Sequence, residues 1–313
     1  MSMSFRPMSG FKTFSIGSNG PEDILALTDG ALITGNDAGQ ILRIEPDLKT
    51  VTVIAEIGGR GLGLDLLPDG RLVVCNALLG LQAVDMVSGQ VEMLVSAIGG
   101  EPLKFCNNCA VAKDGTIYFS SSTTRHGIEG STKDIVEGRK TGRLFRRNPD
   151  GSVDTVLADI SFANGVALSP DESFVLVNST GEYGIHRAWL TGDRAGQRDM
   201  FATDLPGFPD NLSVGSDGLI WCALVTPVTA ALKQIERLPG WLRFILAKLP
   251  EPKSTQPAKA AYCAAFDWEG TMVHGLEDTS GAFSFTTCAR EHQGRVYLGS
   301  LHGSNIAYFD LPR

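Results

Sequence analysis

The chain has 313 residues, of which 43% are hydrophobic and 20% are charged, and its formal net charge is −8 at pH 7. This composition is typical of a soluble globular protein, and an acidic balance without a polybasic run argues against a nucleic-acid partner. The amino-terminal stretch lacks the apolar core of a secretory signal, and no apolar run of about 18 residues predicts a membrane span. Six scattered cysteines suit reduced thiols, so we expect a cytoplasmic protein.

A repeated pattern of apolar run, two-residue turn and second apolar run covers most of the chain. The turn is usually Asp-Gly, which favours a type I′ β-hairpin. Successive turns are 40, 45, 57, 46 and 76 residues apart; they begin at Asp29, Asp69, Asp114, Asp171, Asp217 and Gln293. Periods of about 40 to 50 residues, each with about four strands, are typical of propeller blades. The sequence therefore predicts one all-β domain over residues 1–313, a six-bladed β-propeller.

Two intervals exceed this period, and we expect them to hold helical insertions over the top face of the propeller. Residues 122–142 are polar and predict a loop with a short helix. Residues 224–258 show helical spacing of apolar residues in two pieces, broken at a Pro-Gly pair. This segment is interpreted as a lid or packing element, with an oligomer contact and a lipid contact as alternatives. If it lines the entrance, Trp241, Phe244 and Ile245 indicate a hydrophobic substrate.

The stretch Cys106-Asn107-Asn108-Cys109 has a C-x-x-C spacing, which is found in zinc sites and in thiol redox pairs. Successive side chains in a strand point to opposite faces, so Cys106 and Cys109 are expected to diverge. A structural zinc site needs a second such pair, which the sequence lacks, and redox pairs normally sit at a helix start. The cysteines are therefore interpreted as small apolar fillers.

Carboxylate and amide residues precede the inner strand of four different repeats, in PED (21–23), CNNC, ANG (163–165) and FPDN (208–211). Inner strands of all blades converge on the channel of a propeller, so these side chains can meet there. Two carboxylates and three amides form a hard oxygen set that suits Ca²⁺, without the His or Cys that softer metals prefer. The predicted ligands are Glu22, Asn107, Asn164, Asp210 and Asn211. Taken singly, several of these asparagines are equally typical of turns.

Three stretches carry a family resemblance: LKFCNNCAVAKDGTIYFSSST (103–123), GRLFRRNPDGSVDTVLADISFANGVALSPDESFVLVNSTG (142–181) and PGFPDNLSVGSDGLIW (206–221). They are similar to the strictosidine-synthase-like branch of a propeller superfamily. That superfamily includes the gluconolactonase/regucalcin, paraoxonase and diisopropylfluorophosphatase enzymes. The resemblance runs over roughly residues 20 to 311. It implies a six-bladed propeller with Ca²⁺ or another divalent ion in the channel, held at Glu22, Asn107, Asn164 and Asp210.

The resemblance also implies finer assignments and shows two departures. Asn211 corresponds to an additional ligand of the paraoxonase-like members, and Asn108 stands where several relatives have an Asp close to the metal or behind its ligands. Strictosidine synthase uses a Glu in its last blade where this chain has Thr287, so condensation of an amine with an aldehyde is not expected. Paraoxonases carry a His pair above the metal, whereas the matching stretch GRGLGLDLL (59–67) has none.

These observations predict a calcium-dependent hydrolase of a small-molecule lactone or related ester. The ion would polarise the carbonyl, and Asp210 would act as general base or as nucleophile. Of the five histidines, His126 is the candidate for substrate contact because the insertion that holds it can overhang the channel. One alternative is a non-catalytic propeller, in which a metal pins the blades and the top face binds a ligand or partner. The other is a metal-free condensing enzyme, which Thr287 disfavours.

Overall fold

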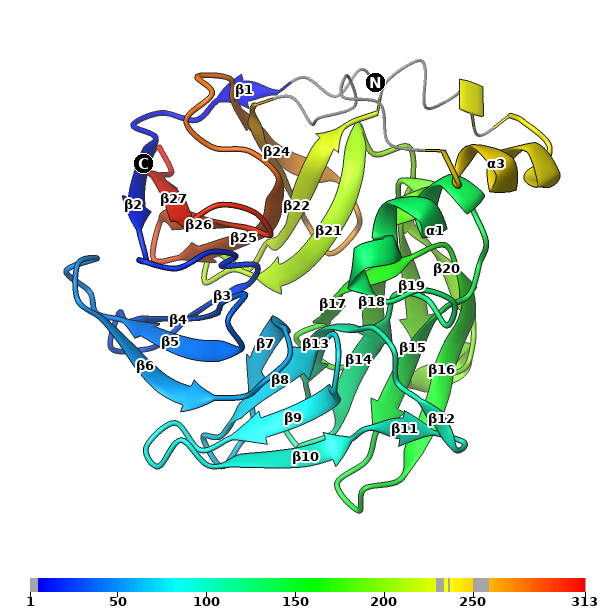
Figure 1. Cartoon of the computed structure of the whole chain (residues 1–313), viewed down its shortest axis with the longest axis horizontal. Helices are drawn as coiled ribbons and strands as arrows, with labels where there is room; N and C mark the ends of the chain where they lie inside the picture. The colour runs from blue at the N-terminus through cyan, green and yellow to red at the C-terminus, as the bar shows by residue number, and fades with distance from the viewer. Residues whose placement is uncertain (1–4, 229–233, 236, 250–258, 313) are drawn as a thin grey trace.

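The computed structural model describes residues 5–228, 234–235, 237–249 and 259–312. Six antiparallel sheets follow one another along the chain and stand in a ring around a central axis (Figure 1). In every sheet the strand that faces the axis comes first in sequence (β2 and β1, from the amino-terminal segment, join the outer edges of two sheets). The six innermost strands contact one another in sequence around the ring, which closes it. The predicted six-bladed β-propeller is confirmed.

The blades are numbered in chain order. Blade 1 holds β3 (Ile24–Ala26), β4 (Leu32–Gly35), β5 (Gln40–Ile44) and β6 (Val51–Glu56), and blade 2 holds β7 (Gly61–Leu66), β8 (Leu72–Asn76), β9 (Gly80–Val84) and β10 (Val91–Val95). Blade 3 holds β13 (Cys106–Val111), β14 (Ile117–Ser121), β15 (Gly142–Arg147) and β16 (Val153–Ile160), and blade 4 holds β17 (Ala163–Leu168), β18 (Phe174–Ser179), β19 (Gly184–Trp189) and β20 (Arg198–Ala202). Blade 5 holds β21 (Gly207–Val214), β22 (Ile220–Pro227), β23 (Ala261–Phe266) and β24 (Met272–Asp278), and blade 6 holds β25 (Thr286–His292), β26 (Arg295–Ser300) and β27 (Asn305–Asp310). A small hairpin of β11 (Ala97–Ile98) and β12 (Glu101–Pro102) joins blades 2 and 3, and 3₁₀ turns lie at Thr180–Glu182 and Gly192–Arg194.

Two amino-terminal strands complete blades 5 and 6, which the sequence analysis did not anticipate. β2 (Lys12–Ser15) pairs antiparallel with β27, so blade 6 combines both ends of the chain. β1 (Arg6–Pro7) adds a parallel fifth strand beside β24. Both strands are short and largely exposed, so they lack the alternating apolar pattern by which the other strands are recognised.

The hairpin turns differ in type from the prediction. In blade 1, φ is positive at Gly30 (+84°) and not at Asp29, whose carboxylate instead accepts a hydrogen bond from the backbone N–H of Ala31 at 3.0 Å. This is a three-residue loop with a glycine at its left-handed position, and the Asp-Gly turns of blades 2, 3 and 5 share these features. The type I′ prediction is therefore wrong for these turns. Among the six repeated turns, the Gln293-Gly294 turn alone has positive φ at both residues.

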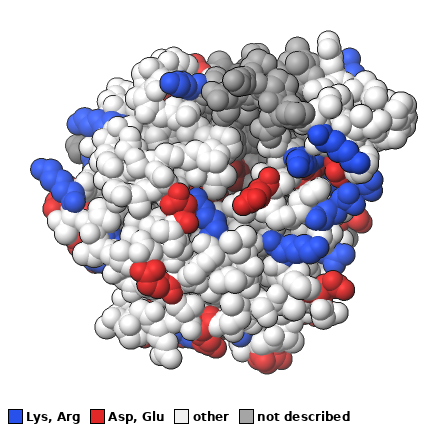
Figure 2. Space-filling model, in the orientation of Figure 1, with Lys and Arg blue, Asp and Glu red and all other residues white. Residues whose placement is uncertain are grey.

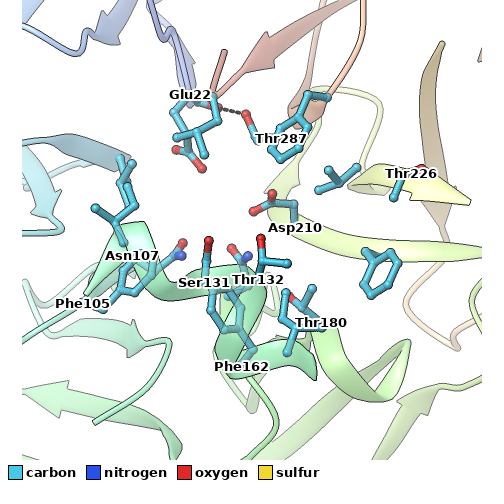
Figure 3. Close-up of a pocket in the computed structure, with 18 of the residues that line it drawn as sticks. Glu22, Phe105, Asn107, Ser131, Thr132, Phe162, Thr180, Asp210, Thr226 and Thr287 are labelled. Carbon is cyan, nitrogen blue, oxygen red and sulfur yellow. Dashed lines mark hydrogen bonds between the residues drawn. The ribbon is translucent and has the colours of Figure 1, made fainter. Parts of the chain in front are cut away.

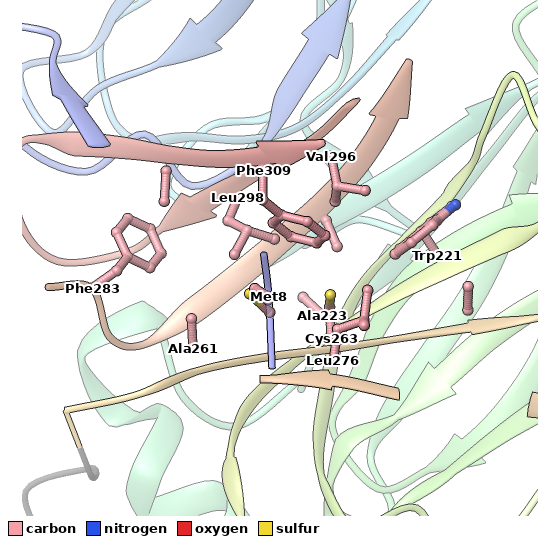
Figure 4. Packing of buried hydrophobic residues seen from close by; sticks show 13 residues of the cluster. Met8, Trp221, Ala223, Ala261, Cys263, Leu276, Phe283, Val296, Leu298 and Phe309 are labelled. Carbon is pink, nitrogen blue, oxygen red and sulfur yellow. The ribbon is translucent and has the colours of Figure 1, made fainter. Parts of the chain in front are cut away.

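Apolar residues from neighbouring blades fill the space between them. Figure 4 shows the cluster between blades 5 and 6, where Trp221 and Cys263 pack against Leu298 and Phe309. The amino-terminal Met8 reaches into the same cluster. Because each blade contributes one face to the cluster on either side, no blade has a complete core of its own, and the ring is stabilised as a unit.

Buried carboxylates on the inner side also connect blades. Asp23 Oδ2 accepts a hydrogen bond of 2.9 Å from the backbone N–H of Leu64, which joins blade 1 to blade 2. Asp65 Oδ2 accepts one of 2.7 Å from Val111, which joins blade 2 to blade 3. These bonds fix the offset between neighbouring inner strands, and the side chains around the axis are positioned accordingly.

The cysteines are all free and buried, as the filler interpretation expects. The predicted divergence of Cys106 and Cys109 is wrong, however, because the register of β13 against β14 shifts between these two residues. A bulge of this kind inserts an extra residue and turns both thiols to the same side. There they lie beside Cys75 of blade 2, within an apolar cluster that also contains Phe119.

The two insertions are partly helical. Residues 122–142 contain a 3₁₀ turn at Ile128–Gly130 followed by α1 (Ser131–Glu137), as predicted. In the second insertion β22 continues to Pro227, so residues 224–227, which the prediction placed in the insertion, are part of this strand. α3 (Gly240–Leu246) begins directly after the predicted break and packs against α1, while the first predicted helical piece lies largely outside the described residues. None of the helices in the described residues is long and apolar enough to cross a membrane.

Candidate metal centre

A cavity of about 210 Å³ opens at the end of the channel that α1 covers. Its floor holds Glu22, Asn107, Asn164 and Asp210, which belong to four different blades or the segment leading into one. Figure 3 shows the carboxylates of Glu22 and Asp210 pointing toward one another across this floor, with the Asn107 amide beside them. The structure thus brings together four of the five predicted ligands, all of them buried.

Three oxygen atoms in this group have no hydrogen-bond partner although they are buried: Glu22 Oε2, Asn107 Oδ1 and Asn164 Oδ1. The amide nitrogen of Asn107 donates to Ser122 Oγ at 2.9 Å, which leaves its oxygen directed into the cavity. Buried polar atoms are normally paired, because an unpaired one costs about 1–3 kcal/mol. Three such acceptors at one point, one of them on Glu22, next to the carboxylate of Asp210, need a cation or several donors to satisfy them.

The pKa values of the two carboxyl groups on the floor also indicate that the site needs a cation. Burial raises the pKa of Asp210 to about 7, although a hydrogen bond from Asn164 opposes the rise. Burial also holds the pKa of Glu22 well above its usual range, and the charges of Asp210 and Asp23 add to this effect. Two carboxylates in a low-dielectric site repel each other and favour the protonated form unless a cation neutralises them.

Asn211 is not among the described residues that line the cavity, and its side chain takes part in a separate set of hydrogen bonds behind Glu22. The backbone N–H of Val166 donates to Asn108 Oδ1 at 2.8 Å, which fixes the orientation of the Asn108 amide. Asn108 Nδ2 then donates to Asn211 Oδ1 at 3.0 Å, and Asn211 Nδ2 donates to Glu22 Oε1 at 3.1 Å. The oxygen of Asn211 is therefore engaged with Asn108, and Asn211 presents a donor to Glu22.

The remaining predicted site residues lie at different distances from the floor. Thr287 Oγ1 donates to the backbone oxygen of Glu22 at 2.7 Å and also lines the cavity (Figure 3). His126 is not among the described residues that line the cavity; its Nε2 lies 3.6 Å from Glu137 Oε1 on α1. Trp241, Phe244 and Ile245 are likewise absent from the cavity lining in the described part of the chain.

The walls of the cavity are apolar, and the sequence analysis missed the residues that form them. Each of four phenylalanines stands two positions before a floor residue, and these pairs are Phe105–Asn107, Phe162–Asn164, Phe208–Asp210 and Phe285–Thr287. Phe105, Phe162 and Phe285 stand directly before β13, β17 and β25, and Phe208 is the second residue of β21, so the entry of each of these inner strands supplies a wall residue together with a residue at the channel end. This repeated F-x-[N/D/T] spacing is the signal that could have identified the walls. Leu62, Ile128, Ile135 and Leu301 add to them, with hydroxyls from Ser131, Thr132, Thr180 and Thr226.

A glycine allows the floor strands to approach. A Cβ on Gly165 would lie 2.2 Å from the backbone nitrogen of Leu212 and 2.5 Å from the backbone oxygen of Asp210. Asn164-Gly165 is therefore part of β17 rather than a turn, and the glycine lets β17 contact β21 closely. This close approach holds Asn164 beside Asp210.

The described residues contain no group of three or more His, Cys, Asp or Glu arranged to hold a metal. The floor has two carboxylates and two amides instead, a combination with hard oxygen donors only. Such a set fits Ca²⁺, which accepts carboxylate and amide oxygens and completes its shell with water, better than it fits zinc.

Comparison with known families decides the relationship. The model described as SMP-30/Gluconolactonase/LRE-like region matches residues 28–237. The chain belongs to this family. A second model, strictosidine synthase-like, N-terminal, matches residues 8–44. Both agree with the resemblance found in the sequence motifs.

Curated relatives of this SMP-30/gluconolactonase-like chain carry several names. It is 33% identical over 320 residues to the adipocyte plasma membrane-associated protein of Salmo salar, a match that covers 94% of this chain and 76% of that protein. The human protein of that name is 30% identical over 315 residues, covering 93% and 75%. Protein strictosidine synthase-like 13 of Arabidopsis thaliana is 33% identical over 261 residues, covering 81% of this chain and 62% of that protein.

Solved structures share the fold at lower identity. A gluconolactonase from Xanthomonas campestris superposes with a TM-score of 0.69 at 20% identity, covering 98% of this chain and 91% of that one. The calcium-binding protein regucalcin from Agrobacterium tumefaciens superposes with a TM-score of 0.66 at 14% identity, covering 99% and 96%. At these identities the likeness concerns the propeller fold.

Proposed function

We propose that this protein is a calcium-dependent hydrolase of a lactone or related ester, with the ion held by Glu22, Asn107, Asn164 and Asp210. The observation that carries the proposal is the group of three buried, unpartnered oxygens beside Asp210. The family relationship supports it, since solved relatives are described as a gluconolactonase and as a calcium-binding protein. When bound, Ca²⁺ would act as a Lewis acid that polarises the substrate carbonyl and stabilises negative charge on its oxygen.

Asp210 is the residue we assign to the chemistry. Its carboxylate lies on the cavity floor, where it can take a proton from water or attack the carbonyl carbon directly. Asn164 donates a hydrogen bond to it and so fixes its orientation. Asn211 holds the other carboxylate, Glu22, and in this assignment is a positioning residue rather than a ligand.

The walls suggest the class of substrate. Glu22 and Asp210 are the only charged residues among the described residues that line the cavity, and the four phenylalanines dominate its sides. A polyhydroxylated sugar lactone would need more polar partners than the few hydroxyls of these walls offer, because buried hydroxyls without hydrogen bonds are costly. We therefore assign an uncharged lactone or ester with an apolar substituent.

The first experiment combines chelation with a substrate panel. Protein stripped with a chelator is compared with protein given Ca²⁺, using aryl esters, alkyl-substituted lactones and glucono-δ-lactone as substrates. We expect apolar substrates to be cleaved only with Ca²⁺, and Asp210→Asn to be inactive while its fold is retained. Asp204→Asn is the matched control. It makes the same change at an exposed aspartate in the segment between β20 and β21, and it should keep full activity.

Two results would redirect the assignment. A large calcium-induced rise in melting temperature without any hydrolysis would favour the non-catalytic propeller, in which the ion only pins the blades. Full activity in Asp210→Asn would remove Asp210 from the chemistry. A single turnover in H₂¹⁸O tests the nucleophilic role, because label in Asp210 requires that water attack Cγ of an Asp210–acyl anhydride, which a general base never forms.

A further inference from the structure

An apolar stripe is exposed on α3 and on the turn that continues it. Trp241, Ile245 and Leu249 lie four residues apart, so they follow one face of the helix. Their exposed fractions are 66%, 49% and 58%. Large apolar side chains are rarely grouped on the surface unless they contact something. We call these three residues the α3 stripe.

The opposite side of α3 is fixed to the propeller. Arg243 Nε donates to the backbone oxygen of Val136 at 3.0 Å, and Ala247 is buried. Val136 belongs to α1, which lines the cavity on its other side. Figure 1 shows α3 projecting at the rim of the ring, beyond α1. The stripe therefore points outward from a helix that is held in place.

The charge around the stripe has the opposite sign to the rest of the protein. The described residues of 122–142 and 228–249 together carry seven Lys or Arg and three Asp or Glu, a net charge of +4, in a chain whose net charge is −8. Of the acidic residues, Asp134 and Glu137 are buried, and Glu137 pairs with Arg125 and Arg139. Figure 2 shows Lys and Arg side chains gathered on the side of this face that carries α1 and α3.

A convex apolar stripe with an aromatic residue, flanked by basic groups, matches the chemistry of an anionic lipid surface. Trp favours the boundary between headgroups and acyl chains, and each Lys or Arg near an anionic leaflet strengthens binding. A second copy of this chain fits less well, because two stripes in contact would bring two basic surfaces together. The acidic remainder of the propeller would be repelled by the same leaflet, which sets the orientation.

We propose that the α3 stripe docks this protein onto anionic membranes, with Trp241, Ile245 and Leu249 entering the headgroup region and the surrounding Lys and Arg side chains binding lipid phosphates. Docking places the α1 side of the propeller, where the cavity opens, toward the lipid. The proposal does not depend on any catalytic activity.

Vesicle sedimentation tests it directly. Full-length protein is mixed with vesicles of phosphatidylcholine alone or of phosphatidylcholine with phosphatidylserine at low and high salt. We expect binding to the anionic vesicles only, weakened by salt. Trp241→Glu combined with Ile245→Glu should lower the partition coefficient roughly tenfold or more, since charged groups replace apolar ones at the interface. Val87→Glu, at a fully exposed valine on the β9–β10 turn, is the matched control and should bind like wild type.

Fold and specificity are checked in the same series. The double variant should keep the wild-type melting temperature, because both side chains are exposed. Trp241→Phe should still bind while losing the blue shift of tryptophan emission on binding. Absence of binding by wild type, equal binding by the double variant, or equal binding to neutral vesicles would overturn the proposal. A concentration-dependent dimer that the double variant abolishes, without vesicle binding, would assign the stripe to a second copy instead.

Discussion

The side-chain amide of Asn108 donates to the oxygen of Asn211 across the channel, from blade 3 to blade 5, at 3.0 Å. Both residues are buried, and the bond continues on one side to the backbone of Val166 and on the other to Glu22. Four blades are thus joined beneath the proposed ion by two asparagine side chains. The orientation of each amide is set by its neighbour, so a change at Asn108 is transmitted to Glu22.

Substitutions at Asn108 should change calcium affinity in opposite directions. Asn108→Ala removes the donor to Asn211 and frees Glu22, and loss of such a positioning contact typically weakens metal binding by about 10–100-fold. Asn108→Asp keeps the acceptor for the backbone N–H of Val166 but obliges the amide of Asn211 to turn. The turned amide offers its oxygen to the site, and the new carboxylate at position 108 adds one negative charge. We expect tighter calcium binding in that variant. Calorimetric titration measures the calcium affinity of both variants, with Asn148→Ala in an exposed turn as control. Unchanged affinity in Asn108→Ala would contradict the role given to the hydrogen bonds from Asn108 through Asn211 to Glu22.

Gly165→Ala should destabilise the protein strongly. The added Cβ would overlap backbone atoms of Leu212 and Asp210, which cannot move without separating β17 from β21. We expect a loss of about 3 kcal/mol in the free energy of unfolding, together with loss of calcium-induced stabilisation. Gly127→Ala is the control, because a Cβ there meets nothing within 4 Å. Denaturant unfolding with and without calcium gives both quantities, and equal stability of the two variants would show that the strands can yield.

The chelated protein should lose stability as the pH rises. The pKa of Asp210 is about 7 in the folded state and about 4 in an unfolded chain, so between these values the folded state holds a proton that the unfolded state has released. Stability therefore falls from about pH 4 to about pH 7, on the order of 4 kcal/mol for three pKa units. Melting curves of chelated wild type and Asp210→Asn test this: the variant should lose the part of the slope that Asp210 contributes while the part from Glu22 persists, and calcium should remove the slope from wild type. A wild type that becomes more stable over this range would contradict the assignment.

The thiols of Cys75, Cys106 and Cys109 should be unreactive in the native protein. Burial raises the pKa of Cys75 well above its usual range, and the neighbouring thiols add to the effect. The thiolate is the reactive form, so a thiol reagent should modify these cysteines only after unfolding. Titration with and without denaturant, followed by peptide mapping, locates the modified residues. Rapid native modification at Cys109 would mean that blade 3 opens locally.

Much of the fold follows from local patterns in the sequence. Each Asp-Gly turn lies between apolar runs, and its spacing counts the blades directly. Floor residues such as Asn107 and Asn164 could be selected because they occupy equivalent places in successive repeats. The amino-terminal strands β1 and β2 could not be predicted from such patterns, since their pairing with blades 5 and 6 is decided by ring closure rather than by their own residues.

The finer differences between the sequence-based expectations and the structure have the same physical origin. Strand alternation predicted that Cys106 and Cys109 diverge, but the bulge between them depends on the contact of β13 with the neighbouring blade. Asn211 resembles a ligand in sequence, and only its bond to Asn108 shows that its oxygen is already engaged. His126 was selected for its position in an insertion, whereas in the structure its Nε2 lies 3.6 Å from Glu137 Oε1 and it is not among the described residues that line the cavity.

The pairing of β2 with β27 has a consequence for how the protein is made. Glu22 follows β2 and is synthesised early, yet its backbone is held by Thr287, and that of Pro21 by the backbone N–H of Ser300, both in blade 6. The first-made carboxylate of the floor therefore acquires its position only after the last blade has emerged from the ribosome. Calcium would then bind with full affinity only to a chain whose synthesis has passed blade 6. A nascent chain that lacked only blade 6 would contain all four proposed oxygen ligands and would still have no assembled site.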